Sequence, residues 1–382
     1  MAASTSTLWR WSLRDLRAHW VKVGAIALVI ALGTGGYAGL TSNAEWRRVS
    51  YAESYESLGM YDVRVAMIPG SVVEEGTLDG VVGPIEGVRA ISERLLVPTQ
   101  VEAEAPEGPV LVRGEIMGAD LSSGQPDVAR FHVFGGRMLS EADVGAPVAM
   151  LENNFASFYD LPDSGEVTVR GGTRLGYVAR ATTPEYFVVS PPGELFLSEA
   201  GFAAVFTSLE TAQALADTPG AVNDAVVLLE PGADRRAVVE AIESGLAAAG
   251  LGADVTTRDD NTGYTTLLAD IDTDQQMFNA LAILLFTGAV VAAYLMIHRM
   301  TQQQRREFGV AMALGVPPRQ IALRPLLVSA QIAFLGVLLG IGVGYLVSKA
   351  FENLLRTFLP LPVWKMDFQT GLFAGVALVG FL

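Results

Sequence analysis

The sequence of 382 residues contains no cysteine, three histidines and three lysines. Because the chain has no thiol group, it can have no disulfide, no thiolate catalysis and no cysteine-ligated metal site. Only His132 lies in the large polar region, so a zinc site built from several histidines is excluded there. No lysine is followed by serine or threonine, which excludes a P-loop, and no G-x-S-x-G stretch occurs. We therefore expect a chain that is not an enzyme and itself binds no cofactor or metal.

Charge is missing from three long apolar runs. Residues 23–40, 277–297 and 325–348 contain no Asp, Glu, Lys, Arg or His. Their lengths suit a helix that crosses a hydrocarbon core about 30 Å thick, which takes about 20 residues. A fourth apolar run begins at Thr370 and extends only to Leu382. It predicts either a re-entrant end or the start of a fourth helix in a truncated chain, and we favour the truncated helix.

Basic residues are rare in the long stretch between the first two runs. Residues 41–276 hold 14 basic and 37 acidic residues, whereas the segment before the first run and the loop 298–324 together hold nine basic and two acidic ones. Because basic flanks stay on the cytoplasmic side, the N-terminus and the loop 298–324 are predicted to be cytoplasmic and residues 41–276 exported. A cleaved signal peptide is the alternative for the first run, but 18 apolar residues exceed the usual core of about 7–15.

The exported region has the pattern of an α+β domain. Alternating strands dominate it, and Gly171-Gly172 between two of them predicts a type I′ hairpin. Residues 221–260 predict a strand, an amphipathic helix and a strand, with Val238, Ile242 and Leu246 on the apolar stripe of the helix. The residues just after the first span and just before the second predict helices that leave the membrane as a stalk; polar linkers are the alternative.

Three features of this region contain residues that could support chemistry or binding. Asp270, Asp272 and Asp274 begin like a calcium loop, but Gln275 and Leu281 stand where such a loop needs Gly and Glu, so a solvated helix face is preferred. The apolar residues around Pro191-Pro192 predict either core packing with a loop or a surface for a lipophilic substrate or partner. His132 alone is interpreted as structural.

The spans contain small residues instead of charges. Their lack of ionisable groups argues against a channel or secondary transporter. Gly336, Gly340 and Gly344 repeat at four-residue spacing, and the first span ends in "GTGGYAG". Such spacing lets helices approach closely, either between two subunits or within one.

The loop after the second span carries a recognisable motif. "RREFGVAMALGVPPRQI" resembles the cytoplasmic coupling loop of FtsX/MacB-type ABC transporter permeases, the mechanotransmission or type VII class. Further segments resemble the MacB-like periplasmic core domain in the right order: "GPIEGVRAISERLLVPTQV", "VRGEIMGAD", "GGRMLSEADVGAPVAML" and "VVLLEPGADRRAVVEAIE". The resemblance implies an α-helical membrane protein with a large inserted extracytoplasmic α+β domain, at least three transmembrane helices and a truncated fourth.

The resemblance also implies a division of the chain. In order, it gives a cytoplasmic amphipathic segment (1–20), a first membrane helix (21–40), the extracytoplasmic core domain with a stalk helix at each end (41–276), a second membrane helix (277–297), the coupling loop (298–324), a third membrane helix (325–348), an extracytoplasmic connection (349–369) and the start of a fourth membrane helix (370–382). The FtsX-like permease domain spans 277–382. For residues 1–20, a basic flank that only sets topology is the alternative.

The implied function is mechanical. A separate cytoplasmic ATPase dimer binds ATP and magnesium, and its rearrangement passes through the coupling loop to the exported domain. The implied coupling residues are Arg305, Arg306, Glu307, Phe308, Gly309, Leu314, Gly315, Arg319 and Gln320, with Gly336, Gly340 and Gly344 for helix packing. The alternative for the loop is that its charge only enforces topology.

The resemblance places the chain in the plasma membrane of a bacterium, in contact with lipid and with a second permease copy or repeat, and without nucleic acid. The expected task is export or extraction of a lipophilic molecule, peptide or lipoprotein. Two alternatives stay open: an FtsX-like regulator of an extracellular partner such as a cell-wall hydrolase, and a membrane-anchored sensor without an ATPase.

Overall fold

A computed structural model of the chain describes residues 12–14, 16–189, 200–303, 305–315, 317–359 and 361–381. They divide into two compact units. The helical unit comprises Met1–Val49, Asp270–Thr357 and Lys365–Leu382, and the α/β unit comprises Ser50–Ala269 and Phe358–Trp364. Each unit is described by itself.

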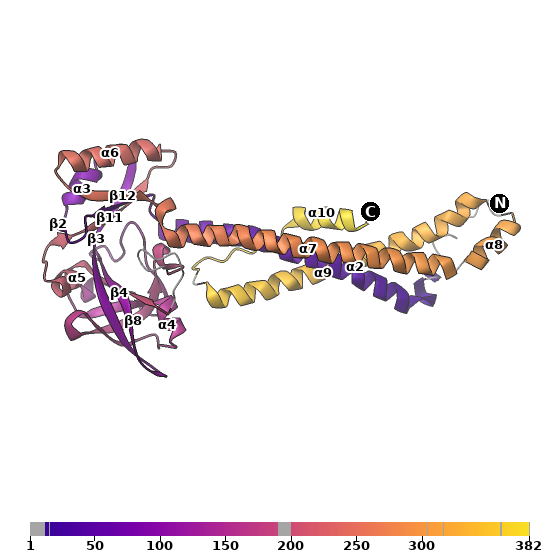
Figure 1. The fold of residues 1–382 in the computed structure, drawn as a ribbon, viewed down its shortest axis with the longest axis horizontal. Helices are drawn as coiled ribbons and strands as arrows, with labels where there is room; N and C mark the ends of the chain where they lie inside the picture. The colour runs from indigo at the N-terminus through magenta and orange to yellow at the C-terminus, as the bar shows by residue number, and fades with distance from the viewer. Residues whose placement is uncertain are drawn as a thin grey trace. The chain divides into compact units, whose positions relative to one another are not determined.

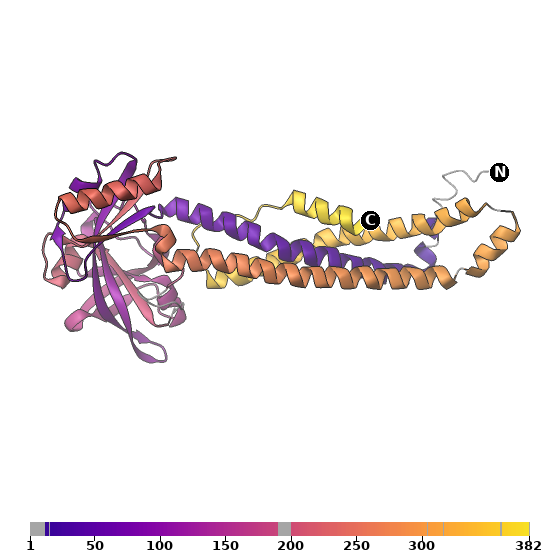
Figure 2. The same cartoon turned by 45° about the horizontal axis from the view of Figure 1, so that its top comes forward.

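The helical unit is built from long apolar helices. Its elements are most of α2 (Trp20–Leu58), most of α7 (Thr262–Gln303), α8 (Arg305–Ala313), nearly all of α9 (Pro318–Phe358) and α10 (Thr370–Phe381). By length and composition, α2, α7 and most of α9 are able to cross a membrane. These three helices lie alongside one another (Figures 1 and 2). A small buried cluster joins them, with Ile26 on α2, Ala293 on α7 and Ile332 on α9.

Helix continues beyond two of the apolar runs, as predicted. After the first run α2 extends to Leu58, and before the second run α7 already begins at Thr262. The alternative of polar linkers at these places is therefore wrong. Of the segment 1–20, only residues 12–14 and 16–20 are described, so the predicted amphipathic helix lies mostly outside the described residues.

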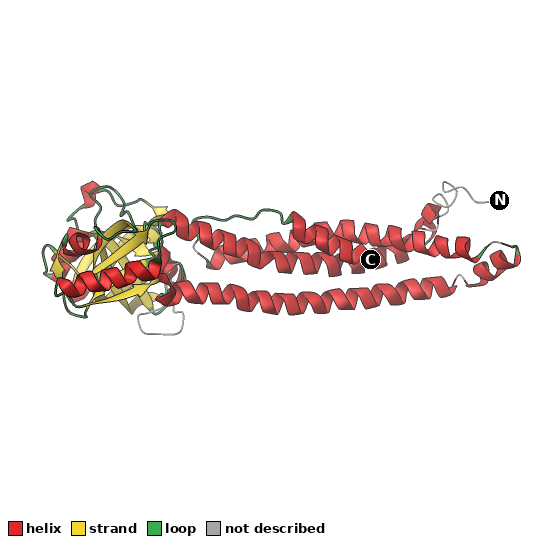
Figure 3. Cartoon of the chain, turned by 90° about the horizontal axis from the view of Figure 1, so that it is seen from above, coloured by secondary structure: helices red, strands yellow, loops and turns green. Residues whose placement is uncertain are grey.

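The α/β unit contains all the strands that the structure describes (Figure 3). The main sheet has the order β12-β1-β11-β3-β4-β9-β6-β8-β5, with β7 paired to β3 and β8, while β10 and β2 form a separate pair. The strands are β1 (Val63–Met67), β2 (Val73–Glu74), β3 (Val88–Ala105), β4 (Gly108–Ala119), β5 (His132–Gly136), β6 (Val148–Glu152), β7 (Gly165–Val169), β8 (Thr173–Thr182), β9 (Phe202–Ser208), β10 (Ala221–Val222), β11 (Asp224–Leu229) and β12 (Ala253–Thr257).

The predicted strand-helix-strand unit is present as β11, α6 (Arg235–Ala248) and β12. β1 lies between the two strands and pairs antiparallel with both, so the unit is split by an inserted strand. Asp234 caps α6 by accepting hydrogen bonds from the backbone of Arg236 and Ala237. The predicted apolar stripe of the helix is buried with the residues of the sheet. Figure 1 shows α6 beside the short helix α3 (Thr77–Val82), and the two helices are in contact.

The predicted glycine hairpin joins β7 to β8. Both Gly171 and Gly172 have positive φ, as a type I′ turn requires, and the backbone N–H of Thr173 donates to Arg170. In the ladder, however, Val169 lies opposite Thr173, so three residues rather than two separate the paired strands. The hairpin prediction is right, and the extra residue is a local departure from the two-residue form.

Strand β9 lies between two hydrophobic cores, and all seven of its residues are buried. Ala203 and Val205 face the core that α6 covers, whereas Phe202, Ala204 and Phe206 face a second one. In the second core the ring centroid of Phe206 lies 5.3 Å from that of Phe131 and 5.5 Å from that of Tyr186. Alternate side chains of a strand point to opposite faces, so β9 holds the two cores together.

Phe206→Ala is expected to lower the free energy of unfolding of the α/β unit by about 3–5 kcal/mol, because it leaves a cavity where a fully buried ring packs on two others. Denaturant titration of the full chain in detergent, followed by tryptophan and tyrosine fluorescence, measures the change. Leu111→Ala is the matched control, since that side chain is 63% exposed. Equal losses in the two variants would contradict the packing described for β9.

Candidate functional site

The motif-bearing loop of the helical unit folds as a short helix followed by a tight turn. Helix α8 ends where Leu314 donates its backbone N–H to Val310 (3.1 Å) and Gly315 donates to Met312 (3.0 Å). Gly315 has φ +81°, a left-handed conformation that glycine adopts at low cost. Helix α9 then begins at Pro318, a position where the missing N–H of proline is harmless.

The outer surface of α8 combines charge with exposed apolar side chains. Arg305, Arg306 and Gly309 are exposed, and Phe308 is half-buried. Leu314 at the turn is 79% exposed, and Val310 and Met312 are more than half exposed. The side chains of Glu307, Arg319 and Gln320 lie outside what the structure describes. Of the predicted coupling residues, those described therefore share one short, open segment.

The predicted glycines of α9 face the first long helix of the same chain. A Cβ on Gly336 would lie 2.7 Å from the Cβ of Ile30, and one on Gly340 would overlap the hydroxyl of Thr34. The contact is reciprocal, because a Cβ on Gly35 would lie 2.5 Å from the carbonyl oxygen of Gly340. These residues form a glycine seam in which the backbones of α2 and α9 touch. Of the two alternatives, the structure shows packing within one subunit for these faces.

The three aspartates of the calcium-like stretch are bound by arginines of α2. Arg47 is buried and donates to Asp274 (2.6 Å) and Asp270 (2.9 Å), which lie one turn apart on α7. Arg48 pairs with Asp272. The aspartates are partly exposed, yet they are ion-pair partners and not merely a solvated helix face. Among the described residues, no group of three or more His, Cys, Asp or Glu is arranged to hold a metal ion.

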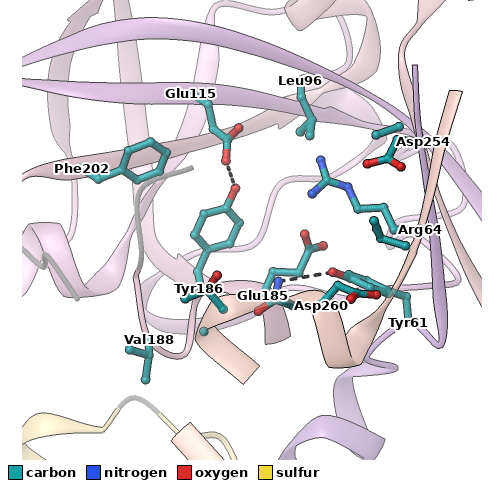
Figure 4. Close-up of a pocket in the computed structure, with 15 residues that line it drawn as sticks. Tyr61, Arg64, Leu96, Glu115, Glu185, Tyr186, Val188, Phe202, Asp254 and Asp260 are labelled. Atoms are coloured by element: carbon teal, nitrogen blue, oxygen red, sulfur yellow. Dashed lines mark hydrogen bonds between the residues drawn. The ribbon is translucent and has the colours of Figure 1, made fainter. Parts of the chain in front are cut away.

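A polar cavity of about 310 Å³ lies within the α/β unit (Figure 4). It is bordered by β1, β4, β12, the short 3-10 helix η3 (Pro184–Tyr186) and the start of α7. The lining residues are Tyr61, Arg64, Ala66, Leu96, Glu115, Glu185, Tyr186, Val188, Phe202, Asp254, Thr256, Asp260, Asn261, Thr262 and Gly263. Sequence patterns gave no sign of this cavity, because its residues come from segments up to about 200 positions apart.

Buried ion pairs hold the wall of this cavity. Arg94 is almost fully buried and donates to Asp224 (2.5 Å) and to both carboxylate oxygens of Glu185. Arg64 donates to the other oxygen of Asp224 (2.6 Å), and this carboxylate raises the pKa of Arg64. The network joins β1, β3, β11 and η3. A charge in a protein interior is tolerated when it is paired and hydrogen-bonded in this way.

Glu115 has a different environment. Its carboxylate accepts a hydrogen bond from the hydroxyl of Tyr186, and the described residues give it no salt bridge. Burial raises the pKa of Glu115, an effect that the Tyr186 hydrogen bond and the charge of Arg64 reduce without cancelling. Glu115 thus lines the cavity with a raised pKa and without a salt bridge from the described residues.

Two further candidates from the sequence are His132 and the apolar stretch around Pro191-Pro192. His132 lies half-buried on β5 with its ring roughly perpendicular to that of Phe134, and burial lowers the pKa of His132. This placement agrees with a structural role. The Pro191-Pro192 dipeptide lies outside the described residues, while the flanks of its apolar stretch lie in η3 and β9.

Comparison with protein families identifies one part of the chain. Residues 279–382 match the family described as FtsX-like permease C-terminal. This segment is therefore similar to the C-terminal domain of FtsX-like permeases. The match confirms the resemblance that "RREFGVAMALGVPPRQI" suggested, and together with the three apolar helices it makes the chain a membrane protein. The domain includes most of α7 and all of α8, α9 and α10, whereas α2 and its half of the glycine seam lie outside the matched range.

Some solved structures are remotely similar to this chain. The periplasmic region of MacB from Actinobacillus actinomycetemcomitans aligns at 10% identity and a TM-score of 0.37, covering 58% of this chain and 97% of that structure. The extracellular domain of the ABC-type transporter YknZ from Gram-positive bacteria aligns at 14% identity and a TM-score of 0.35, covering 51% and 98%. Among curated proteins, none matches the chain.

Gly340→Ala is expected to destabilise the FtsX-like permease domain, because the new methyl group overlaps Thr34 and forces α2 and α9 apart. We expect a loss of about 1–3 kcal/mol, the range typical of overpacking, visible as a lower melting temperature in detergent. Gly342→Ala on the same helix is the control, since a Cβ there meets nothing within 4 Å. A loss at Gly342 as large as that at Gly340 would refute the seam.

Glu115→Gln is expected to change the pH dependence of stability. Because the pKa of Glu115 is raised in the folded chain, the folded state gains a proton before the unfolded state does as the pH falls. The wild type therefore loses stability relative to the variant as the pH rises from about 4.3, the unfolded value, through the raised pKa. Scanning fluorimetry should show similar melting temperatures at about pH 4 and a higher one for the variant at about pH 7.5.

Glu243→Gln, on the exposed side of α6, serves as the control for this titration. Its melting temperature should follow that of the wild type at every pH. A Glu115→Gln variant that melts below the wild type at neutral pH would show that the ionised carboxylate stabilises the fold.

Proposed function

We propose that the chain is the membrane subunit of an ABC-type mechanotransmission complex, in which a separate ATPase acts on the segment around α8. The observation that carries this proposal is a segment similar to FtsX-like permeases, in which the short helix α8 presents two exposed arginines and is followed by an exposed leucine. A side chain such as Leu314, 79% exposed at the end of a helix, is suited to burial against a partner.

The chemistry of α8 fits a protein partner. Arg305 and Arg306 are exposed and can make charge-assisted hydrogen bonds to carboxylates, which are stronger than neutral ones. Topology alone requires only positive charge, whereas this segment also carries exposed Val310, Met312 and Leu314. An apolar surface with a basic edge calls for a partner groove with an acidic rim. The basic flanks lead us to expect this loop on the cytoplasmic side, which is where an ATP-consuming partner would be found.

The helical unit provides a route for movement. Along the chain α8 stands between α7 and α9, so a displacement of α8 acts on both helices. The glycine seam keeps α9 in backbone contact with α2, and the Arg47 pairs tie α2 to α7. Close-packed elements move as bodies because an interior filled at crystal-like density does not absorb displacement. The three long helices would therefore respond together.

ATP and magnesium would be bound by the partner, since this sequence has no P-loop of its own. A second permease copy would complete the complex. The α/β unit would lie outside the cytoplasm and use the transmitted movement to export or extract a lipophilic molecule, a peptide or a lipoprotein.

Leu314→Asp combined with Arg305→Glu and Arg306→Glu should abolish retention of the ATPase. The change introduces charge at the apolar contact and reverses the sign of the basic edge. The full-length protein is purified from native membranes, co-purified proteins are identified and ATP hydrolysis is measured. We expect an ATPase with the wild type and at least a tenfold lower amount with the variant, which corresponds to about 1.4 kcal/mol of lost binding.

Leu111→Asp combined with Arg174→Glu and Arg236→Glu is the matched control, because all three side chains are exposed on the α/β unit. This variant should retain the ATPase. A correctly inserted wild-type protein without any ATPase would overturn the proposal in favour of an anchored sensor. Equal retention by both triple variants would place the contact elsewhere.

A further inference from the structure

The carboxylates around the cavity of the α/β unit differ in what offsets their charge. Glu185 is held by Arg94, and Asp260 accepts hydrogen bonds from the backbone and hydroxyl of Thr257 (2.8 and 2.9 Å). Arg64, the basic residue in the lining, is already paired with Asp224. Glu115 and Asp254 have no salt bridge among the described residues. The cavity therefore has an excess of negative charge.

Aromatic rings and apolar side chains complete the wall. The rings of Tyr61, Tyr186 and Phe202 line the cavity, and Leu96 and Val188 add apolar surface. Figure 4 shows the carboxyl groups of Glu115 and Glu185 directed into the same space as the hydroxyl of Tyr186. Ring faces attract ammonium and guanidinium groups, and this attraction strengthens when water is excluded.

We propose that this cavity binds a small organic cation, an ammonium or guanidinium group on a short apolar body, with Glu115 as its counter-ion. A volume of about 310 Å³ is at the lower end of the range for small-molecule sites, about 300–1,000 Å³. A bound cation supplies the positively charged partner that the described residues do not give Glu115 in a salt bridge. The apolar body of the ligand covers Leu96 and Phe202. A metal ion is less suited, because the described residues offer no cluster of three or more ligating side chains.

The cavity is lined by two segments next to long helices, one just after the end of α2 and one at the start of α7. Thr262 and Gly263 line the cavity and are the first residues of α7. Tyr61 and Arg64 line it as well and follow the end of α2 at Leu58. On the α7 side, Asn261 donates its side-chain N–H to the hydroxyl of Tyr61 (3.3 Å). A ligand would thus contact the segment that follows α2 and the first residues of α7, both within the α/β unit. This contact does not depend on whether an ATPase is bound.

Binding is tested with the full chain in lipid nanodiscs, without any partner, at about pH 7.5. The probes are benzylamine, agmatine and spermidine, with benzyl alcohol as the uncharged counterpart of benzylamine. Calorimetric titration should show saturable binding of at least one cation and none of benzyl alcohol. Glu115→Gln should weaken that binding at least tenfold, and Asp254→Asn should weaken it severalfold.

Glu243→Gln is the control and should bind the probe as the wild type does. The ligand-free Glu115→Gln protein should melt no lower than the wild type at this pH, so that lost binding reports the charge and not unfolding. Three results would each overturn the proposal: no saturable binding of any of the three cations up to about 10 mM, equal binding of benzyl alcohol, or binding that Glu115→Gln leaves unchanged.

Discussion

The close approach of α2 and α9 is the constraint on which the helical unit depends. Neither apolar run carries a charge that could pair inside a membrane, so van der Waals contact must hold the helices together. Such contact is strong only when backbones come near, and the glycines of both helices allow this. Gly39 extends the seam by another turn, because a Cβ there would lie 2.8 Å from the carbonyl oxygen of Gly344. A channel would need polar groups along this line; the seam instead makes a solid contact.

The α/β unit is organised around a different principle, the pairing of buried charge. Arg94 joins strand β3 to β11 and η3 by bonding to Asp224 and Glu185, both almost fully buried. Loss of one partner from such a network typically costs about 3–5 kcal/mol, because a charge is left in the interior. Asn223 strengthens the same region by bonding both backbone groups of Leu96. Glu115 differs from these paired groups, because its carboxylate accepts a hydrogen bond from Tyr186 but has no salt bridge among the described residues.

The sequence predicted those features that depend on local pattern. Apolar runs predicted the long helices, alternation predicted the strands, Gly171-Gly172 predicted the hairpin and the stripe around Ile242 predicted α6. The motif at Arg305 predicted the similarity to FtsX-like permeases that is found over residues 279–382. The cavity, the Arg94 network and the arginine partners of Asp270 and Asp274 could not be predicted, because each joins residues far apart in sequence. The sequence shows which charged side chains need an ion-pair partner when they are buried, but it does not show which residue the fold brings next to them.

The ion pairs between α2 and α7 restrict two movements of α7, sliding along its axis and rotation about it, to different extents. Arg47 bonds two carboxylates one turn apart, Asp270 and Asp274, on the same face of α7. If α7 slid by half a turn, about 3 Å, one carboxylate would come opposite Arg47 as the other left, and the arginine would keep a partner throughout. If α7 instead rotated about its own axis, both carboxylates would turn away together. The pairing therefore permits α7 to slide along α2 with one ion pair kept, but opposes rotation of α7, which would break both pairs.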